Sequence, residues 1–579
     1  MEAWITDTAA STRFPYYTRA NADEVGPDPF SPLGWSLAWQ KGCIPGVAKG
    51  FVEFGVVAWD EYDLDPPQVF GNWGGYFYNP LSLSRLMGCR MPGVSPEAID
   101  QAYFGDHPGV PPYEAHPEDD NSAATAKLGE TMAWVMSAEP YPAMQAQAAI
   151  AREVVTNRPD LASLSDSELV ARARSMAPLI EQAWIPYCVV CLGGALGPGA
   201  VQAICAAVGR PEDAVKVLSG VGGVESAEAS FALWDLSRLI AGSHDLSAAF
   251  DGGVAGVLAR IHSTTKDGKA FHDAWARVIA EHGHRGPNEW DLRPHSWTTR
   301  QELALGMVDR LRHQSDDRSP HDARARAAIE RERLSGELLA LVEDDATAHG
   351  TLAAGLASAA RWMSLRELGK NACIRLIHEA KLALYELGGR MVERRDLSHP
   401  QEIFDLLDDE LDGFLADPAS FRHTLAEREA AFRSLHQLEP PYIVGGDRPA
   451  PPISAWPRRD ARVATPAGVG DVLQGGPGAP GIVTGRARIV LDPAVAPEMG
   501  SGDILVAPTT DPSWVPLFLS VGGVVTNVGA VGSHAAIVSR ELGVPCAVSV
   551  LDATRRIPDG ATIHIDGSTG TVTVVAAPD

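Results

Sequence analysis

The feature that most restricts how this chain can fold is a long run, from about residue 123 to residue 437, in which apolar residues recur three and four positions apart. Ala, Leu, Glu and Arg dominate this run. Both properties are typical of amphipathic helices that pack against one another, because residues at that spacing share one face of a helix. We therefore predict a large, mainly α-helical region.

The residues on either side of this run follow different patterns. Residues 1 to about 120 are rich in aromatic residues, Pro and Gly, so we expect loops and short elements there. Residues 438–478 are again dense in Pro and Gly, which predicts a semi-rigid linker without regular elements. In 479–579 short runs of alternating apolar residues surround one helical pattern at 534–542, which predicts a small α/β domain.

The chain is long enough for several hydrophobic cores, with 579 residues of which 45% are hydrophobic. The predicted fold class is therefore multidomain: a mainly α-helical domain at 1–437, aromatic-rich to about 120, then the linker at 438–478 and the α/β domain at 479–579.

Charge and targeting signals exclude several classes of protein. The net charge of −26 repels nucleic-acid phosphates and anionic lipids, so neither a nucleic acid nor a membrane is expected as a partner. The start, MEAWITDTAASTRF, does not resemble a secretory signal, and seven scattered cysteines fit a reducing compartment, which favours a cytoplasmic protein. Residues 183–208 are uncharged, but GGALGPG at 193–199 interrupts them, which favours two buried helices over a membrane span.

One histidine stands where a glycine-rich stretch meets the helical pattern of the α/β domain. His534 follows Gly529 and Gly532, and Ser533 before it is a good N-cap, so the ring is expected in the first turn of a helix. The unpaired amides and positive dipole end there favour an anion, and a neutral imidazole is a nucleophile. The pattern thus fits a histidine that carries a phosphoryl group; a capping or core histidine is the alternative.

The surrounding residues resemble a known signature. TNVGAVGSHAAIVSRELGVPCAV at 526–548 is similar to the phosphohistidine motif of the swivelling domain in phosphoenolpyruvate (PEP)-utilising enzymes. This resemblance implies that His534 is phosphorylated and that Thr526, Gly532 and Ser533 belong to the phosphate-binding loop. The stretch departs from the family pattern where Asn527 replaces the usual acid and Ala530 replaces the second glycine.

Three further stretches resemble the acceptor domain of rifampicin phosphotransferases: YYTRANADEVGPDPFSPLGWS at 16–36, EHGHRGPNEWDL at 281–292 and LRELGK at 365–370. On the last stretch, Arg366 and Lys370 are four apart on a predicted helix and point the same way, as a cation pair on a transferring phosphoryl group would. The alternative is a solvated helix face with Glu367 as the partner.

The motif at 281–292 supplies the remaining candidates. The resemblance places His284 as the base that takes the proton of the acceptor hydroxyl, Glu289 as the group that orients it, and Arg285 on phosphate. A structural histidine in a turn is the alternative for His284.

The order of domains suggests where ATP binds. We find no ATP-grasp pattern at the front and no room for a pyruvate domain after the histidine motif, a layout similar to the histidine subunit of phenylphosphate synthases. The resemblance implies a dikinase relay in which a separate ATP-grasp partner binds ATP and Mg²⁺, AMP and phosphate leave, and His534 carries the remaining phosphate to an acceptor. No metal site is expected on this chain.

The acceptor is the least determined part of this prediction. A cluster of rings fits a flat phenolic acceptor, although such rings also form hydrophobic cores; it consists of Phe51, Phe54, Trp59, Phe70, Trp73, Tyr76, Phe77 and Tyr78. A phenol, with a pKa of roughly 10, is a competent nucleophile beside a base and two cations. We therefore expect phenol phosphorylation, with a rifampicin-type antibiotic phosphotransferase and a phosphocarrier or regulatory protein as alternatives.

Overall fold

The computed structural model describes all residues of the chain except 105–106, 108, 224, 462–463, 494–495, 498, 531 and 579. The chain forms two compact units, each built from segments that are separate in sequence. Unit 1 comprises 1–194, 290–293 and 368–462, and unit 2 comprises 195–289, 294–367 and 463–579. The predicted domain boundaries at 437 and 478 stay predictions.

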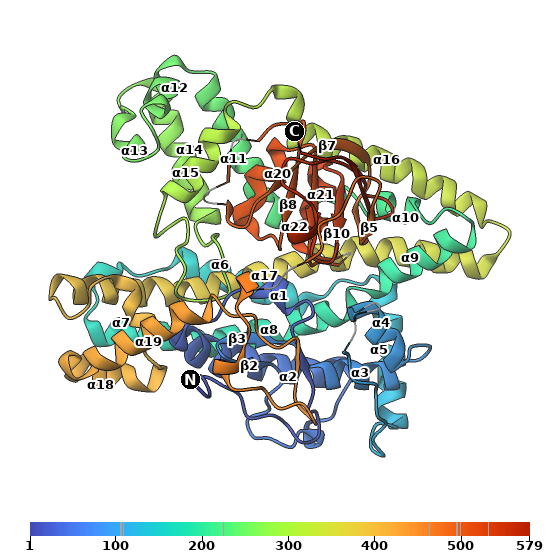
Figure 1. Cartoon of the computed structure of the whole chain (residues 1–579), viewed down its shortest axis with the longest axis horizontal. Helices are drawn as coiled ribbons and strands as arrows, with labels where there is room; N and C mark the ends of the chain where they lie inside the picture. The colour runs from blue at the N-terminus through green and yellow to red at the C-terminus, as the bar shows by residue number, and fades with distance from the viewer. Residues whose placement is uncertain are drawn as a thin grey trace. The chain divides into compact units, whose positions relative to one another are not determined.

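Unit 1 is mainly helical, with short strands near its N-terminus (Figure 1). Its described strands pair as β1 with β4 and β2 with β3. The elements are β1 (Tyr17–Thr18), α1 (Ala22–Val25), a π-helix (Gly34–Cys43), α2 (Ile44–Phe54), β2 (Gly71–Trp73), β3 (Tyr76–Tyr78), α3 (Leu81–Arg90), α4 (Pro96–Phe104), α5 (Ser122–Ser137), α6 (Pro142–Thr156), α7 (Asp166–Arg174), α8 (Met176–Gly193), α18 (Leu411–Ala416), α19 (Arg422–Leu435) and β4 (Ile443–Val444).

The expectation of loops and short elements before residue 120 is wrong for residues 34–54, where a π-helix continues directly into α2. Most residues of this segment are buried, while Lys41, Lys49 and Glu53, eight and four positions apart, form an exposed stripe on one face. The prediction missed this helical periodicity because the Trp, Gly and Pro residues of the segment favoured loops.

The aromatic cluster forms hydrophobic core, as the alternative had it. Seven of its eight rings are buried, and only Trp59 is largely exposed, at 50%. The rings contact one another, with centroids 4.9 Å apart for Phe70 and Phe77 and 5.2 Å apart for Trp73 and Tyr78. The cluster therefore gives no support to a phenol site.

The helical pattern predicted from about 123 to 437 is confirmed, since helices from α5 to α19 fill this range. In unit 2, residues 195–289 and 294–367 form what we call the helical region. It contains α9 (Leu196–Ala207), α10 (Asp213–Val217), α11 (Glu225–Ala241), α12 (His244–Asp251), α13 (Val257–Arg260), α14 (Lys266–His282), α15 (Glu302–Leu311), α16 (Pro320–Leu341) and the first part of α17 (Ala346–Glu393), whose second part belongs to unit 1.

The C-terminal part of unit 2 is an α/β domain around an eight-stranded sheet, called the sheet domain below (Figure 1). The strand order is β5-β12-β11-β7-β8-β9-β10-β6, in which β7, β8, β9 and β10 are parallel neighbours and the other pairs are antiparallel. The strands are β5 (Val472–Gln474), β6 (Gly476–Ala479), β7 (Ile482–Ile489), β8 (Asp503–Ala507), β9 (Gly523–Thr526), β10 (Cys546–Val548), β11 (Thr562–Asp566) and β12 (Thr571–Ala576).

The sheet begins inside the segment 438–478 that we expected to be a linker without regular elements. Strands β5 and β6 lie there in whole or in part, at the two edges of the sheet. Pro477 in β6 is compatible with an edge position, because an edge strand can leave one backbone N–H position without a partner. Pro and Gly density therefore misled the expectation that 438–478 contains no regular elements.

The two faces of the sheet have different partners. Along β8, Ile504 and Val506 point into a core formed within the sheet domain together with α22 (Ala553–Arg556). Leu505 and Ala507 point to the other face, which carries α20 (Val515–Ser520) and α21 (His534–Leu542) and shares one hydrophobic core with α11, α14 and α15. The sheet domain thus packs on the helical region; swivelling of this domain stays a prediction.

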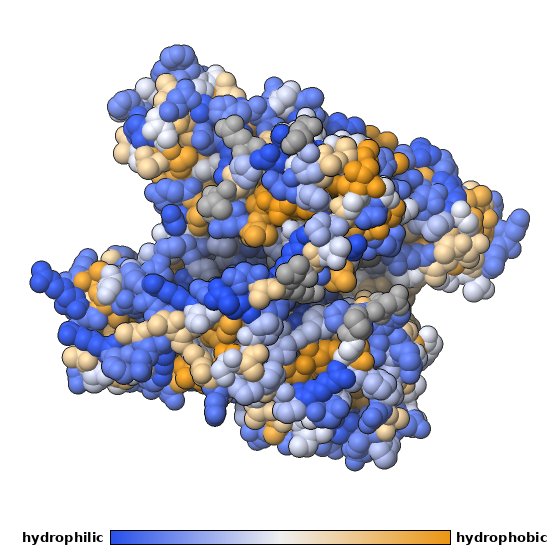
Figure 2. All heavy atoms as spheres, in the orientation of Figure 1, coloured by the Kyte–Doolittle hydropathy of each residue, from blue (hydrophilic) through white to orange (hydrophobic). Residues whose placement is uncertain are grey.

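One helical stretch passes a test for a membrane span. By length and composition alone, Asp166–Ala207 is long and apolar enough to cross a membrane, and 39% of its most apolar part is buried. The predicted interruption is present, because α8 ends at Gly193 and α9 begins at Leu196, but burial of the pair is partial. On the face shown in Figure 2, hydrophilic residues predominate around small apolar groups. A cytoplasmic location stays a prediction.

Candidate functional site

His534 is the first residue of α21, as the sequence predicts. The Ser533 hydroxyl accepts a hydrogen bond from the backbone N–H of Ala536, at 3.2 Å, and so caps the helix. Both Ser533 and His534 are buried. The ring therefore lies beside the unpaired amides and the positive dipole end of a helix, where an anion is favoured.

The carboxyl ends of two parallel strands meet at this helix start. His534 follows β9 through a short loop, and Thr510 follows β8, so both come from the edge of the sheet at which ligands bind in α/β folds. The Thr510 hydroxyl lies 3.2 Å from Nδ1 of His534. Phe518 of α20 meets the imidazole edge to face, with ring centroids 6.4 Å apart. The ring is thus fixed by a hydrogen bond and an aromatic contact.

Arg366 approaches the histidine loop from the helical region. A Cβ added to Gly532 would lie 2.5 Å from Nη1 of Arg366, so the guanidinium packs directly against this glycine. Gly532 therefore leaves room for a cation two residues before His534. The proposed contact between Arg366 and the phosphate loop fits this geometry.

The second predicted cation, Lys370, lies four residues further along α17, in the part that belongs to unit 1. Its predicted role beside Arg366 stays a prediction. Glu367 is only 5% exposed, so the alternative of a solvated helix face with Glu367 is not what the structure has.

The GHRGPNE stretch at 283–289 follows α14. Arg285 and Glu289 form a buried ion pair, with Nη1 of Arg285 at 3.2 and 3.3 Å from the two carboxylate oxygens of Glu289. His284 is also buried. Because Glu289 neutralises Arg285, this motif brings little net charge to the site.

This motif contacts the sheet domain through a residue that the sequence did not single out. The backbone N–H of Asn288 donates to Oδ2 of Asp511, at 3.3 Å. Asp511 is the neighbour of Thr510, which contacts His534. Removal from water and the nearby Glu289 carboxylate raise the pKa of Asp511 to about 6, against hydrogen bonds from Ser513 and Asn288 that lower it.

Two residues of the histidine motif play local structural roles. Thr526 ends β9 and is fully buried, and its carbonyl accepts the N–H of Val550. Asn527 donates its amide N–H to the hydroxyl of Thr554 and accepts the Thr554 backbone N–H on its carbonyl oxygen, at 2.8 and 2.9 Å. An ionised carboxylate accepts but cannot donate, so the replacement of the usual acid gives a two-way link to α22.

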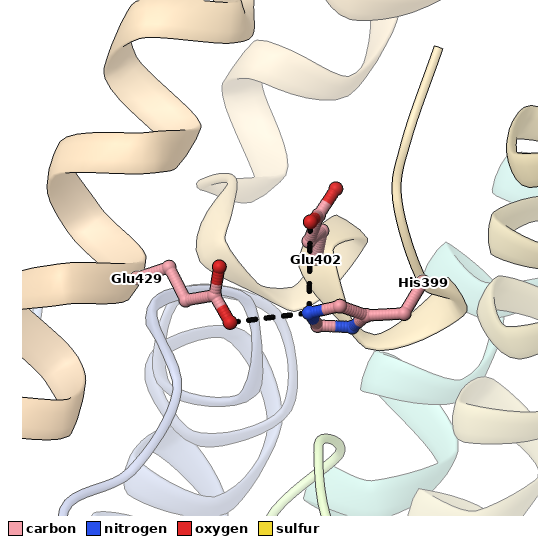
Figure 3. A group of neighbouring side chains, drawn as sticks. All are labelled: His399, Glu402 and Glu429. Carbon is pink, nitrogen blue, oxygen red and sulfur yellow. Dashed lines mark hydrogen bonds and ion pairs between the residues drawn. The ribbon is translucent and has the colours of Figure 1, made fainter. Parts of the chain in front are cut away.

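A separate group in unit 1 offers three metal-type ligands that the sequence did not indicate. Nε2 of His399 lies 3.1 Å from Glu429 and 3.5 Å from Glu402 (Figure 3). Arg433 and Arg293 also pair with Glu429. These cations offset the carboxylate charge, so the group is an ion-pair network on which we place no metal.

Comparisons with known proteins match both parts of unit 2. The model of the rifampicin phosphotransferase fourth domain matches residues 189–367, which is nearly all of the helical region. The model of the mobile domain of PEP-utilising enzymes matches residues 499–570, most of the sheet domain.

Relatives in curated collections agree with these matches. An uncharacterized protein of Mycobacterium tuberculosis is 28% identical over 98% of this chain, which spans 62% of that protein. Rifampicin phosphotransferases of Streptomyces sviceus and Bacillus subtilis are 31% and 27% identical over 53% and 57% of this chain, and over 35% and 36% of their own lengths. The chain thus spans less than two thirds of the curated relatives it matches.

The fold and the matches therefore define a protein with the mobile domain of PEP-utilising enzymes beside a domain similar to the rifampicin phosphotransferase fourth domain. Both matches support a place for the chain in the superfamily of PEP-utilising enzymes. Among the functions considered from the sequence, the comparisons fit the rifampicin-type alternative better than phenol phosphorylation.

Proposed function

We propose that this chain is a phosphotransferase of the rifampicin phosphotransferase type, in which His534 carries a phosphoryl group to the hydroxyl of a small molecule. The observation that carries this proposal is the position of His534 at a capped helix start, beside the carboxyl ends of β8 and β9 and next to Arg366. A nucleophilic imidazole, amides that hold phosphate and a cation that offsets charge are the parts that phosphoryl transfer needs.

The hydrogen bond to Thr510 suggests which nitrogen reacts. The Thr510 hydroxyl occupies Nδ1 of His534, so Nε2 is proposed as the nitrogen that is phosphorylated. A Thr510 oxygen that accepts the Nδ1–H would also fix the tautomer whose lone pair lies on Nε2. Analysis of the phosphohistidine isomer by NMR is expected to find phosphorus on Nε2; phosphorus on Nδ1 would contradict this assignment.

The proposed reaction balances as ATP plus acceptor hydroxyl plus water giving AMP, phosphate and the phosphate ester. Nε2 attacks phosphorus of ATP, AMP leaves, and hydrolysis removes the terminal phosphate from the histidine. The acceptor oxygen then attacks the remaining phosphorus as the N–P bond breaks. Arg366 would offset the charge that develops, and His284 would take the hydroxyl proton.

ATP and Mg²⁺ are proposed to bind at an ATP-grasp partner, as the resemblance to the split synthases implies. The acceptor is proposed to be a hydroxyl compound of the rifampicin kind, because the names of the matched relatives point there and the aromatic cluster is buried core. A panel of a macrolactam and simple phenols distinguishes the two acceptor classes; turnover of phenols alone would restore the phenol prediction.

The direct test follows the label from ATP. The chain is incubated with an ATP-grasp partner, Mg²⁺ and ATP labelled at the β-phosphorus, and the protein is analysed by mass spectrometry. The expected result is label on His534 and release of unlabelled phosphate. Absence of modification at His534 while AMP is produced would contradict the relay.

A further inference from the structure

Two acidic side chains of the sheet domain bind backbone N–H groups of the helical region. Asp511, after β8, accepts from Asn288, and Glu541, on α21, is buried facing the backbone N–H groups of Val221 and Gly222. Both contacts cross the same surface that contains the shared hydrophobic core. Apolar contacts tolerate sliding, whereas hydrogen bonds hold only over a narrow range of distance and angle. The two carboxylates therefore help to set the position in which the sheet domain rests, together with the hydrogen bonds that Arg310 and Arg318 donate to carbonyls of the sheet domain.

Asp511 is tied to the site on both sides. Its Oδ1 accepts the backbone N–H of Ser513 at 2.7 Å, which fixes its orientation, and its Oδ2 faces Asn288. Thr510, its neighbour in the chain, contacts His534. Asp511 thus lies one residue from the hydroxyl that contacts the imidazole.

Glu541 lies seven residues after His534 on the same helix, two turns away and on the same side. It is 2% exposed and contacts a glycine-rich loop, 219–223, in which Gly220, Gly222 and Gly223 have φ of 61°, 70° and 65°. Arg331 binds the carbonyl of Gly220, and Ser364 of α17 donates to the carbonyl of Gly223 at 3.0 Å. The loop that receives Glu541 is therefore held from two helices.

Burying these two carboxylates costs desolvation free energy, which keeps the contact between the sheet domain and the helical region reversible. Removal from water raises the pKa of both Asp511 and Glu541, with Glu289 adding to the effect at Asp511. When the surfaces separate, each carboxylate regains its hydration and each N–H regains a water partner. The hydrogen bonds thus give register without locking the contact.

We propose that Asp511 and Glu541 are positioning residues that latch the sheet domain on the helical region, in the docked position from which His534 gives up its phosphate. The last clause rests on the proposed function; the latch itself does not.

Hydrogen exchange on the full chain, without nucleotide, tests the latch directly. In Asp511→Ala the amide exchange of the peptide that contains Asn288 is expected to rise at least about fivefold, because its acceptor is lost. Asp559→Ala is the matched control, because exposed Asp559 also accepts a backbone N–H, that of Ile489 at 2.9 Å, inside the sheet domain. The control should change exchange near Ile489 only. Unchanged exchange at Asn288 in Asp511→Ala would overturn the proposal.

Glu541 is tested by Glu541→Ala, which removes both carboxylate oxygens. Exchange of the peptide with Val221 and Gly222 is expected to rise, because the side chain that faces these N–H groups is lost. Unchanged exchange there would remove Glu541 from the latch. Thermal melting checks that each variant folds, and Asp511→Asn replaces Asp511→Ala if the latter does not.

A kinetic split then tests the link to transfer. Asp511→Ala is expected to leave the loading of His534 from ATP within about twofold of wild type and to slow transfer to the acceptor roughly tenfold. Equal slowing of both half-reactions would contradict a positioning role. If wild-type His534 is never loaded, the proposed function fails, whereas the exchange experiment still decides the latch.

Discussion

Two histidine–threonine pairs lie in the same sheet domain and differ in their surroundings. Nδ1 of His534 is 3.2 Å from the Thr510 hydroxyl, and Nδ1 of His564 is 2.8 Å from the Thr484 hydroxyl. The first pair joins a helix start to the carboxyl end of β8 and is buried, whereas the second joins opposite residues of β11 and β7 and reaches the surface.

The hydrogen bond alone therefore does not make a reactive histidine. His534 has the amides of a helix N-terminus beside it and Arg366 against its loop, while a ring in mid-strand has its neighbouring amides committed to the sheet. In the proposed relay, the helix start and the cation would therefore supply the phosphate chemistry, and the threonine would orient the ring.

The largest expected effect on activity comes from replacing the two histidine rings. His534→Asn should abolish labelling from ATP and lower product formation roughly 10⁴-fold or more, because the nucleophile is removed. His564→Asn, the matched control, should retain wild-type turnover. Product formation by His534→Asn at the wild-type rate would end the proposed relay.

The next effect concerns the cation that only the first pair has. Arg366→Ala should reduce transfer to the acceptor about 10²-fold, because charge on the moving phosphoryl group is no longer offset. Arg333→Ala, at an exposed arginine of α16, is the control and should change transfer little. A steady-state assay of ester formation compares the two; equal activities would exclude Arg366 from the site.

A smaller effect is expected from the threonines. Thr510→Val keeps the shape but removes the hydroxyl, and should slow the loading of His534 roughly tenfold, through loss of one orienting hydrogen bond. Thr484→Val should leave loading unchanged. Rapid-quench measurement of phosphohistidine formation checks both, and similar rates in the two variants would mean that Thr510 does not orient the ring.

The smallest effect is a pH dependence of docking. The pKa of Asp511 is about 6 in the docked structure and about 4 for an exposed aspartate. The docked form binds more protons, so docking is strongest below pH 4, weakens as pH rises through 6 and is constant above 7. Glu289, Asn288 and Ser513 are the polar groups that face it, and Arg285 pairs with Glu289.

Hydrogen exchange at Asn288, taken as the ratio of Asp511→Asn to wild type, measures this effect because the intrinsic pH dependence cancels. The ratio should fall toward one as pH rises from 5 to 7.5. A ratio that does not change with pH would show that Asp511 titrates outside this range.

The sequence predicted those parts of the site that are local. Ser533 and His534 form a cap and first turn within a few residues, and their spacing to Gly532 is visible in one stretch, so both the helix at 534–542 and the candidate histidine were predictable. The six alternating runs likewise became β7 to β12. Helix caps and apolar periodicity involve residues that are close together in the sequence, so they can be recognised without the structure.

What the sequence did not reveal depends on contacts between distant segments. Nothing about Asp511 distinguishes it from the other acids until Asn288, 223 residues away, lies against it. The Trp and Gly residues of the helical segment 34–54 are buried in core, and β5 and β6 tolerate Gly and Pro because they are edges. The sequence shows which residue types are present, but not which of them are buried by contacts with distant segments.

The hydrophobic core that the sheet domain shares with α11, α14 and α15 has a consequence for any excursion of His534 to ATP. Each 100 Å² of apolar surface bared by departure costs about 2.5 kcal/mol. If the sheet domain leaves the helical region, the apolar surface that it exposes must therefore be covered by another apolar surface. If the proposed relay holds, the ATP-binding partner that we propose should offer apolar contacts to Phe518, Val538 and Leu542.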